Sequence, residues 1–468
     1  MLTDPIVALA TPPGRSAMAV VRASGAGVFE VAARVITGFR AEPARQARLA
    51  SLFDAQGRFD QAIYLTYQGP RSETGEDVVE IICHGGLLVP ARLVAALEKA
   101  GCRPAHPGEF TRRAVMHGKM DLLQAEAVAD LVDAETLAQG KAAVLQLEGG
   151  LSQRIGKLRD GMVELLALLA YEVDFPGEDD GPIPRATLEA TRARVLAEVE
   201  GLLATAPAAA RLRAGALVVL AGPPNAGKSS LFNALLGTER ALVTEQPGTT
   251  RDAIEAHADF LGFPIRLVDT AGLGAAVDRV DAMGQAVTRR FAEGADLVLV
   301  CEEATPDSRR AGAPLRPLGL GESTPGPAVP QLRVWTKADR GARAETSSGR
   351  SGAPALATRR RREEGIATSV VTGEGLEALK RAVVARLFAR GAGFADLEPG
   401  LTRERHRTAL ERARVELAGA APHLAAGGDP VLAAHHVQEA VRALDGLIGA
   451  VDVEEVLGRV FASFCVGK

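Results

Sequence analysis

The sequence predicts a multidomain chain: an α/β domain at the N-terminus, a discontinuous α-helical central domain, and a second α/β domain inserted into the helical one. Three patterns predict this fold class. Residues 1–118 mix apolar runs with a helical stretch, residues 119–210 carry apolar residues at helical spacing, and residues 211–389 alternate apolar runs with helices before helical periodicity returns over 390–468. A length of 468 residues suits about three domains.

Composition excludes several classes of protein. The formal net charge is −4 and aromatic residues make up 4% of the chain, so a nucleic-acid partner would need a local basic patch rather than a base-stacking platform. The N-terminal stretch MLTDPIVALATPPG lacks the basic region of a signal peptide, and no apolar run reaches the ~20 residues of a membrane span. The cysteines form no C-x-x-C pair. We expect a cytoplasmic protein without a membrane anchor.

The N-terminal domain should contain strands in IVALAT, AMAVVRAS and DVVEIICHGG, and a helix in LLVPARLVAALEKAG that a glycine ends. In the inserted domain, GALVVLAG is a continuous apolar run, typical of a strand buried on both faces of a parallel sheet. Residues 303–330 are rich in Pro, Gly and Arg, and residues 340–365 are of low complexity, so we expect two flexible loops. The basic run Arg359–Arg362 could touch phosphate, but a solvated loop is the expected interpretation.

A phosphate-binding loop follows the strand in GALVVLAG. The segment GPPNAGKSS matches G-x-x-x-x-G-K-[ST] over Gly222–Ser229 and is followed by the helical stretch SLFNALLG, which is the context that the motif requires. The glycines let the backbone N–H groups face phosphates, while Lys228 reaches the outer phosphates and the Ser229 hydroxyl can bind Mg²⁺. We therefore predict a P-loop nucleotide site.

Two further motifs complete the phosphate side of this site. LVDTAG ends a second buried strand, so Asp269 can hold Mg²⁺ through water and the Gly272 N–H can meet the γ-phosphate. PGTTRD lies between the two motifs, and its Thr250 can give Mg²⁺ a second hydroxyl. Each motif alone is weak, but their order and spacing together are specific.

The base is recognised by TKAD, at Thr336–Asp339. The Asp339 carboxylate can accept hydrogen bonds from guanine N1 and N2, which adenine cannot give, and the Lys337 stem can lie along the base. The segment TSVVTGEGL would close the pocket. The chain therefore resembles a GTPase, although Leu273 replaces the glutamine that orients water in Ras-type enzymes. The residues assigned to GTP are Asn225, Ala226, Gly227, Lys228, Ser229, Ser230, Thr244, Glu245, Gln246, Pro247, Gly248, Thr249, Thr250, Asp269, Thr270, Ala271, Gly272, Thr336, Lys337, Ala338, Asp339, Ser369, Val370 and Val371.

These motifs resemble those of the TrmE–Era group of GTPases. The stretches TPPGRSAMAVVRASG, TGEDVVEIICHGG and HPGEFTRRAVMHGKMDLLQAEAVADLV, together with the C-terminal EEVLGRVFASFCVGK, closely resemble the MnmE (TrmE) family of tRNA-modification GTPases. The resemblance covers essentially the whole chain apart from the two loops.

The resemblance implies a function in tRNA modification. Family members form homodimers through a tetrahydrofolate-binding-like N-terminal domain and work with an FAD flavoprotein of the MnmG type in a heterotetramer. Together they place an aminomethyl or carboxymethylaminomethyl group on C5 of the wobble uridine of certain tRNAs, with 5-formyltetrahydrofolate or another tetrahydrofolate derivative as the one-carbon source. The family's folate positions fall on Arg22, Glu80, Lys119 and Lys468. Taken alone, the first three residues would be interpreted as surface ion pairs.

The resemblance also implies how GTP is hydrolysed. The family uses K⁺ in place of an arginine finger when two G domains dimerise; the cation positions fall on Asn225, with Thr244, Gln246 and Thr249 completing the cage. On the residues alone, Asn225 could equally stiffen the loop. The catalytic acid that orients water, normally Glu, aligns with Asp281, and Asp278 is a rival. The usual base-recognising Asn is replaced by Thr336.

The ending FCVGK has a cysteine four residues from the end of the chain, as in C-a-a-X prenylation, but Gly467 is not aliphatic and no polybasic stretch precedes the motif. It matches the family's C-terminal motif instead, which implies that Cys465 and Lys468 project toward the folate pocket. Cys465 is then a candidate catalytic nucleophile at the pyrimidine ring or a residue that positions substrate.

Two other functions fit the sequence less well. An Era-like regulatory switch acting on RNA or ribosome assembly would need an RNA-binding module after the G domain, whereas the region after Thr402 is helical, alanine-rich and only mildly basic. A folate-dependent aminomethyltransferase without GTPase activity is opposed by the intact P-loop.

Overall fold

The chain forms two compact units in the computed structural model. Unit 1 comprises Met1–Val132, Val144–Glu200 and Arg405–Lys468, and unit 2 comprises Asp133–Ala143 and Gly201–Glu404. The residues that the structure describes are 4–41, 46–174, 183–237, 254–269, 294–304, 329–339, 365–388, 397–449, 464 and 467. The two loops expected at 303–330 and 340–365 fall largely outside these ranges.

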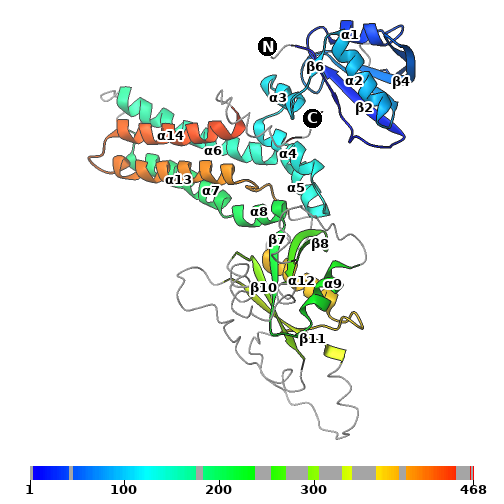
Figure 1. The fold of residues 1–468 in the computed structure, drawn as a ribbon. Coiled ribbons are helices and arrows are strands. Elements are labelled where there is room, and N and C mark those ends of the chain that lie inside the picture. Colours follow the sequence, from blue (N-terminus) through cyan, green and yellow to red (C-terminus); the bar gives the residue numbers. More distant parts are fainter. Residues whose placement is uncertain are drawn as a thin grey trace, which may run out of the picture. The chain divides into compact units, whose positions relative to one another are not determined.

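Unit 1 begins with a six-stranded sheet in the order β3-β4-β5-β2-β1-β6, antiparallel except for the β1–β6 pair (Figure 1). Val7 packs with α1 and α2, whereas its neighbours Ile6 and Ala8 pack with Phe110 of α3, so helices lie on both faces. The predicted strands and helix are confirmed, and Gly101 ends α2 with φ 128°. The elements are β1 (Ile6–Leu9), β2 (Met18–Ser24), α1 (Val28–Val35), β3 (Arg48–Asp54), β4 (Gly57–Tyr67), β5 (Val78–His84), α2 (Leu88–Ala100), β6 (Arg103–Pro104) and α3 (Glu109–Met116).

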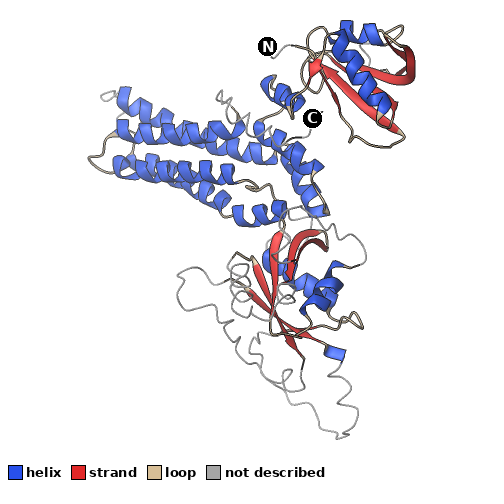
Figure 2. Ribbon diagram, viewed as in Figure 1, coloured by secondary structure: helices blue, strands red, loops and turns tan. Residues whose placement is uncertain are grey.

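The rest of unit 1 is helical, as predicted (Figure 2). The long helices bury apolar residues at intervals of three and four, for example Leu410, Ala413 and Leu417. Arg159 and Asp445 join α6 to α14 at 2.6 Å, and the Arg192 guanidinium donates from α7 to the Leu417 carbonyl of α13. The helices are α4 (Leu122–Val132), α6 (Gly150–Asp174), α7 (Arg185–Leu203), α13 (Glu404–Leu424) and α14 (Pro430–Ile448), together with the second half of α5 (Leu137–Leu147).

Unit 2 contains a second six-stranded sheet in the order β12-β11-β10-β7-β9-β8, parallel except for the β8–β9 hairpin. Along β7, Val218 and Leu220 belong to one hydrophobic cluster and Val219 and Ala221 to another. Both faces of the strand are therefore buried, which explains its unbroken apolar run. The elements are α8 (Ala206–Ala214), β7 (Ala216–Ala221), α9 (Lys228–Leu236), β8 (Ile254–Phe260), β9 (Phe263–Asp269), β10 (Leu297–Glu303), β11 (Gln331–Thr336), β12 (Ile366–Ala367) and α12 (Leu376–Leu387).

One helix, α5, contributes residues to both units. In its first half, Ala138 is fully buried in the core of unit 2, and its N–H donates to the Gly262 carbonyl at 2.9 Å. In its second half, the Gln146 side chain donates to the Leu123 carbonyl of unit 1 at 2.9 Å. Among the described residues, no helix combines the length and apolarity needed to cross a membrane.

A buried ion cluster joins α4 to α13 inside unit 1. Glu126 is 1% exposed and accepts from Arg405 at 2.5 and 2.8 Å and pairs with the fully buried His406 at 2.7 Å. Burial raises the pKa of Glu126, but the hydrogen bonds from His406 and Arg405 outweigh burial and hold the pKa at about 2, below its ordinary 4.5. The cluster therefore favours the folded state when Glu126 is ionised.

We predict that Glu126→Gln destabilises the protein by about 3 kcal/mol near pH 7, because it leaves buried donors without their carboxylate. The folded pKa lies below the unfolded one, so this contribution is complete above about pH 5 and fades as pH falls toward 2. Unfolding followed by circular dichroism between pH 3 and 7 measures it. The control is Glu164→Gln, which breaks an exposed pair with Arg194 and should cost about 0.5 kcal/mol or less. Equal effects of the two substitutions would contradict the prediction.

Candidate functional site

The segment Gly222–Ser229 joins the end of β7 to α9, so the strand and helix predicted on either side of the motif are confirmed. Gly222 has φ 146°, and a Cβ there would lie 2.2 Å from the Cys301 carbonyl oxygen, which no side chain tolerates. Gly227 caps α9 with φ 82°, and Asn225 is also left-handed at φ 62°. The glycines are thus required by close backbone approach and by positive φ.

The carbonyl oxygens of this loop accept hydrogen bonds from three side chains. Lys228 Nζ donates to Gly222 at 3.0 Å and to Pro223 at 2.9 Å. From the β11 end, Lys337 Nζ donates to the Asn225 carbonyl at 2.8 Å and Thr336 Oγ1 to the Ala226 carbonyl at 2.6 Å. The bonds from Lys337 and Thr336 connect the loop to the end of β11. The N–H groups of Lys228, Ser229 and Ser230 open α9 and have no partners within the helix, so the helix N-terminus suits an anion.

Asp269 lies at the end of β9, beside this loop. It is 2% exposed and stands opposite Leu220, two residues before the loop begins. Burial is the main cause that raises the pKa of the nearby Cys301 thiol to about 12. A buried carboxylate and the Ser229 hydroxyl are hard oxygen donors of the kind that Mg²⁺ prefers.

The TKAD segment meets the segment after β12. Ser369 is fully buried, and its hydroxyl donates to Asp339 Oδ1 at 2.8 Å. The Ala338 N–H donates to the Thr368 carbonyl at 3.1 Å, and Lys337 Nζ pairs with Glu303 at 3.0 Å. Sequence reasoning placed Ser369 near the base but missed its bond to Asp339, and it missed Glu303 altogether. Val370 and Val371 are 39% and 84% exposed.

Several predicted site residues lie outside the described residues, so their positions stay predictions: Thr244, Glu245, Gln246, Pro247, Gly248, Thr249, Thr250, Thr270, Ala271, Gly272, Asp281, Cys465 and Lys468. Within the described ranges, no group of three or more His, Cys, Asp or Glu side chains is placed to hold a metal ion.

The predicted folate residues form a second cluster, in unit 1. Arg22 on β2 and Glu80 on β5 are cross-strand partners, joined through Arg22 Nε at 2.9 Å and Nη2 at 2.8 Å. Glu73 also pairs with Arg22, at 2.6 Å, and the Tyr67 hydroxyl donates to the other oxygen of Glu80 at 3.2 Å. The pairing of Arg22 with Glu80 is the ion pair considered from sequence. Neither Glu73 nor Tyr67 was singled out from sequence.

The loop between β4 and β5 connects this ion cluster with Lys119, whose Nζ donates to the Pro70 carbonyl at 2.9 Å. Glu73 lies on the same loop. At the chain end, Phe464 packs against Leu122, and a Cβ on Gly467 would lie 2.5 Å from the Leu9 carbonyl oxygen. Gly467 thus packs near β1, and only glycine fits at this position, where φ is 102°.

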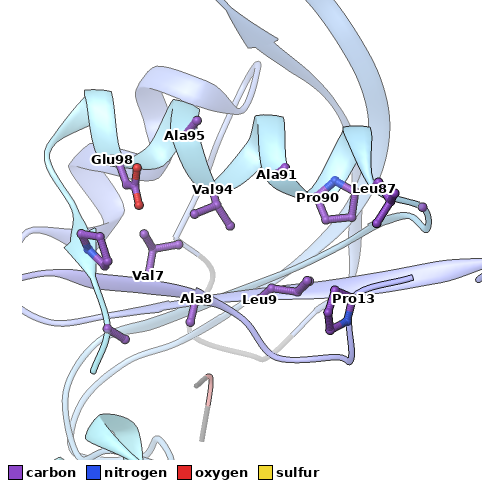
Figure 3. Close-up of a pocket in the computed structure, with 13 residues that line it drawn as sticks. Val7, Ala8, Leu9, Pro13, Leu87, Pro90, Ala91, Val94, Ala95 and Glu98 are labelled. Carbon is purple, nitrogen blue, oxygen red and sulfur yellow. The ribbon is translucent and has the colours of Figure 1, made fainter. Parts of the chain in front are cut away.

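A separate cavity of 480 Å³ lies between α2 and β1 (Figure 3). Its walls are apolar side chains such as Val7, Leu9 and Val94, and Glu98 is the charged residue among the lining side chains. Arg22, Glu80 and Lys119, the predicted folate residues that the structure describes, are not among the residues that line this cavity.

Two family models match the chain. The model described as the MnmE helical domain matches residues 122–465, and the model described as the GTP-binding protein TrmE N-terminus matches residues 5–119. Among solved structures, the G domain of the T. maritima FeoB iron transporter is 28% identical, with a TM-score of 0.25, and the match covers 36% of this chain and 98% of that one.

Curated relatives match over the full length. The tRNA modification GTPase MnmE of Phenylobacterium zucineum is 42% identical over 475 residues, which cover 100% of both chains. The tRNA modification GTPase MnmE of a Thermus thermophilus strain is 43% identical over 472 residues, which cover 100% of this chain and 99% of that one. The chain therefore belongs to the MnmE family of tRNA modification GTPases.

Proposed function

We propose that the protein is the GTP-hydrolysing, folate-binding component of a tRNA wobble-uridine modification complex. The observation that carries this proposal is that one chain contains two separate preformed clusters, a phosphate-binding loop and a half-buried ion pair. A glycine-constrained loop at the carboxyl ends of parallel strands suits a nucleotide, and a cross-strand Arg22–Glu80 pair lies in the domain that matches the family's N-terminal model. The proposed function needs both, because GTP and the folate one-carbon donor would bind at different sites.

At the nucleotide site, backbone N–H groups of the loop and of α9 would bind the phosphates, and Lys228 would leave its carbonyl partners to reach them. The Ser229 and Thr250 hydroxyls would be ligands of Mg²⁺, which neutralises phosphate charge, and Asp269 would hold the ion through water. Asp339, oriented by Ser369, would accept from guanine N1 and N2.

Hydrolysis would depend on K⁺ held by Asn225 together with Thr244, Gln246 and Thr249, with Asp281 orienting the water. The Asn225 backbone is fixed, because its carbonyl accepts from Lys337 and its φ is 62°. A fixed backbone lets its carboxamide hold one orientation toward a cation. Oxygen donors of this kind suit a hard monovalent ion, whose charge would take the place of an arginine finger.

The folate donor would bind near Glu80, with Lys119 and Lys468 as cations for its glutamate tail. The Glu80 carboxylate would accept hydrogen bonds from the N–H groups of the pterin. Arg22 and Tyr67 donate to its two oxygens and so fix its orientation. The partners would be an FAD flavoprotein of the MnmG type and tRNA.

A second copy of the chain would pack against the N-terminal domain. Met18 and Leu49 are each 65% exposed, and Ile63, the cross-strand partner of Leu49, is 39% exposed. Apolar side chains exposed on a sheet suit such an interface. The domains would be residues 1–118, 119–210 with 390–468, and 211–389.

We predict faster GTP hydrolysis in KCl than in NaCl, because the cation supplies positive charge to the transition state. Asn225→Ala should remove this preference and lower the rate in KCl by roughly 100-fold. Phosphate release measured in both salts is the test, and Asn233→Ala, an exposed asparagine of α9, is the matched control that should keep both rates. Equal rates of the unmodified protein in the two salts would rule out the cation site.

We also predict that Cys465→Ser protein hydrolyses GTP normally but fails to restore modified wobble uridine in a strain that lacks the gene, because a hydroxyl is a poorer nucleophile than a thiolate. Mass spectrometry of digested tRNA measures the nucleoside. The control is Cys102→Ala, since burial raises the pKa of the Cys102 thiol to about 12 and makes it unreactive. Full modification by the Cys465 variant would end its proposed role. If the gene-deletion strain retains the nucleoside, the proposed function itself fails.

A further inference from the structure

The side chain of Thr336 forms a hydrogen bond with the phosphate-binding loop. It is 2% exposed, and its hydroxyl lies 2.6 Å from the Ala226 carbonyl oxygen and 3.2 Å from the Glu302 carbonyl oxygen. Both neighbours accept only, so the hydroxyl must donate, and a threonine hydroxyl has one proton to donate. The shorter distance assigns that proton to Ala226.

Guanine presents two kinds of edge to a protein. N7 and O6 accept hydrogen bonds, whereas N1 and N2 carry protons. The Asp339 carboxylate can bind only the second kind, because an ionised carboxylate only accepts. A contact with N7 therefore needs a side-chain or backbone donor, and the lone pairs left on Thr336 would repel N7.

We propose that Thr336 is a positioning residue that fixes the phosphate-binding loop to the base-recognition segment and donates no hydrogen bond to guanine N7. Base selection then rests on Asp339, held by Ser369. This inference rests on the proposed assignment of Asp339 as the residue that recognises guanine.

Neighbouring contacts support a positioning role. Lys337 makes a parallel connection from the same segment, with its Nζ on the Asn225 carbonyl at 2.8 Å and its backbone left-handed at φ 55°. A Cβ on Gly227 would lie 3.5 Å from Thr336 Oγ1, so the loop packs directly on the hydroxyl. Two successive residues of one segment thus hold two successive carbonyls of the other. Loss of either donor should loosen the surface that binds phosphate.

The test compares GDP with 7-deaza-GDP, in which a C–H replaces N7. Calorimetric titration of the full chain in Mg²⁺ gives both dissociation constants. The unmodified protein should bind the two nucleotides within about two-fold of each other, because no bond to N7 is lost. Thr336→Asn adds an amide donor and should bind 7-deaza-GDP about five-fold more weakly than GDP, the equivalent of one neutral hydrogen bond.

Two further variants separate positioning from simple packing. Thr336→Val keeps the shape and removes the donor, so affinity for both nucleotides should fall by about ten-fold while their ratio stays near one. Thr336→Ser restores the hydroxyl and should restore affinity. A preference of about five-fold or more of the unmodified protein for GDP over 7-deaza-GDP would overturn the proposal. Unchanged affinity of a folded Thr336→Val protein would overturn it as well.

A separate arm tests the assignment on which the inference rests. Xanthine carries an oxygen in place of the guanine N2 amino group, so Asp339→Asn should shift preference from GDP to xanthosine diphosphate. If that variant keeps the preference for GDP, the assignment of Asp339 fails. The comparison of GDP with 7-deaza-GDP on the unmodified protein does not depend on that result.

Discussion

The nucleotide site depends on one close contact: the loop after β7 passes directly over the Cys301 carbonyl oxygen. Only a residue without a side chain fits at Gly222, where a Cβ would approach that oxygen to 2.2 Å. The chain must therefore turn there and enter α9 at the edge where β9, β10 and β11 also end. Asp269, Glu303 and Thr336 close those strands, and each reaches the site from its own strand end.

The two candidate sites differ in the groups that would bind a ligand. The nucleotide site is built mainly from backbone groups, held by side chains that donate to loop carbonyls. The cluster in the N-terminal domain is built from side-chain charges that already pair with one another. Arg22 shares its charge between Glu80 and Glu73, so an anion that binds Arg22 must compete with Glu73, which is the more exposed of the two carboxylates.

The helices and strands could be predicted from local sequence patterns, but the contacts between distant side chains could not. The apolar run of β7 and the spacing in the long helices depend on near neighbours, so they could be recognised along the chain. The contacts of Thr336 with Ala226 and of Glu126 with Arg405 and His406 join residues far apart in the sequence. Nothing in either local segment indicates its distant partner. Glu73 was missed for the same reason, since an acidic residue in a polar loop carries no signal until the fold brings Arg22 beside it.

Because α5 contributes residues to both units, it limits where the chain can be cut to make a fragment for experiments. A fragment cut from 211–389 would lack Ala138, which is fully buried in the core of unit 2, and the Gly262 carbonyl would lose its donor. Such a fragment could bind nucleotide and still differ from the same residues in the intact chain. Truncation points chosen by homology to free-standing G domains would divide a folded unit, whereas an expression fragment that keeps Asp133–Ala143 would retain the missing contacts.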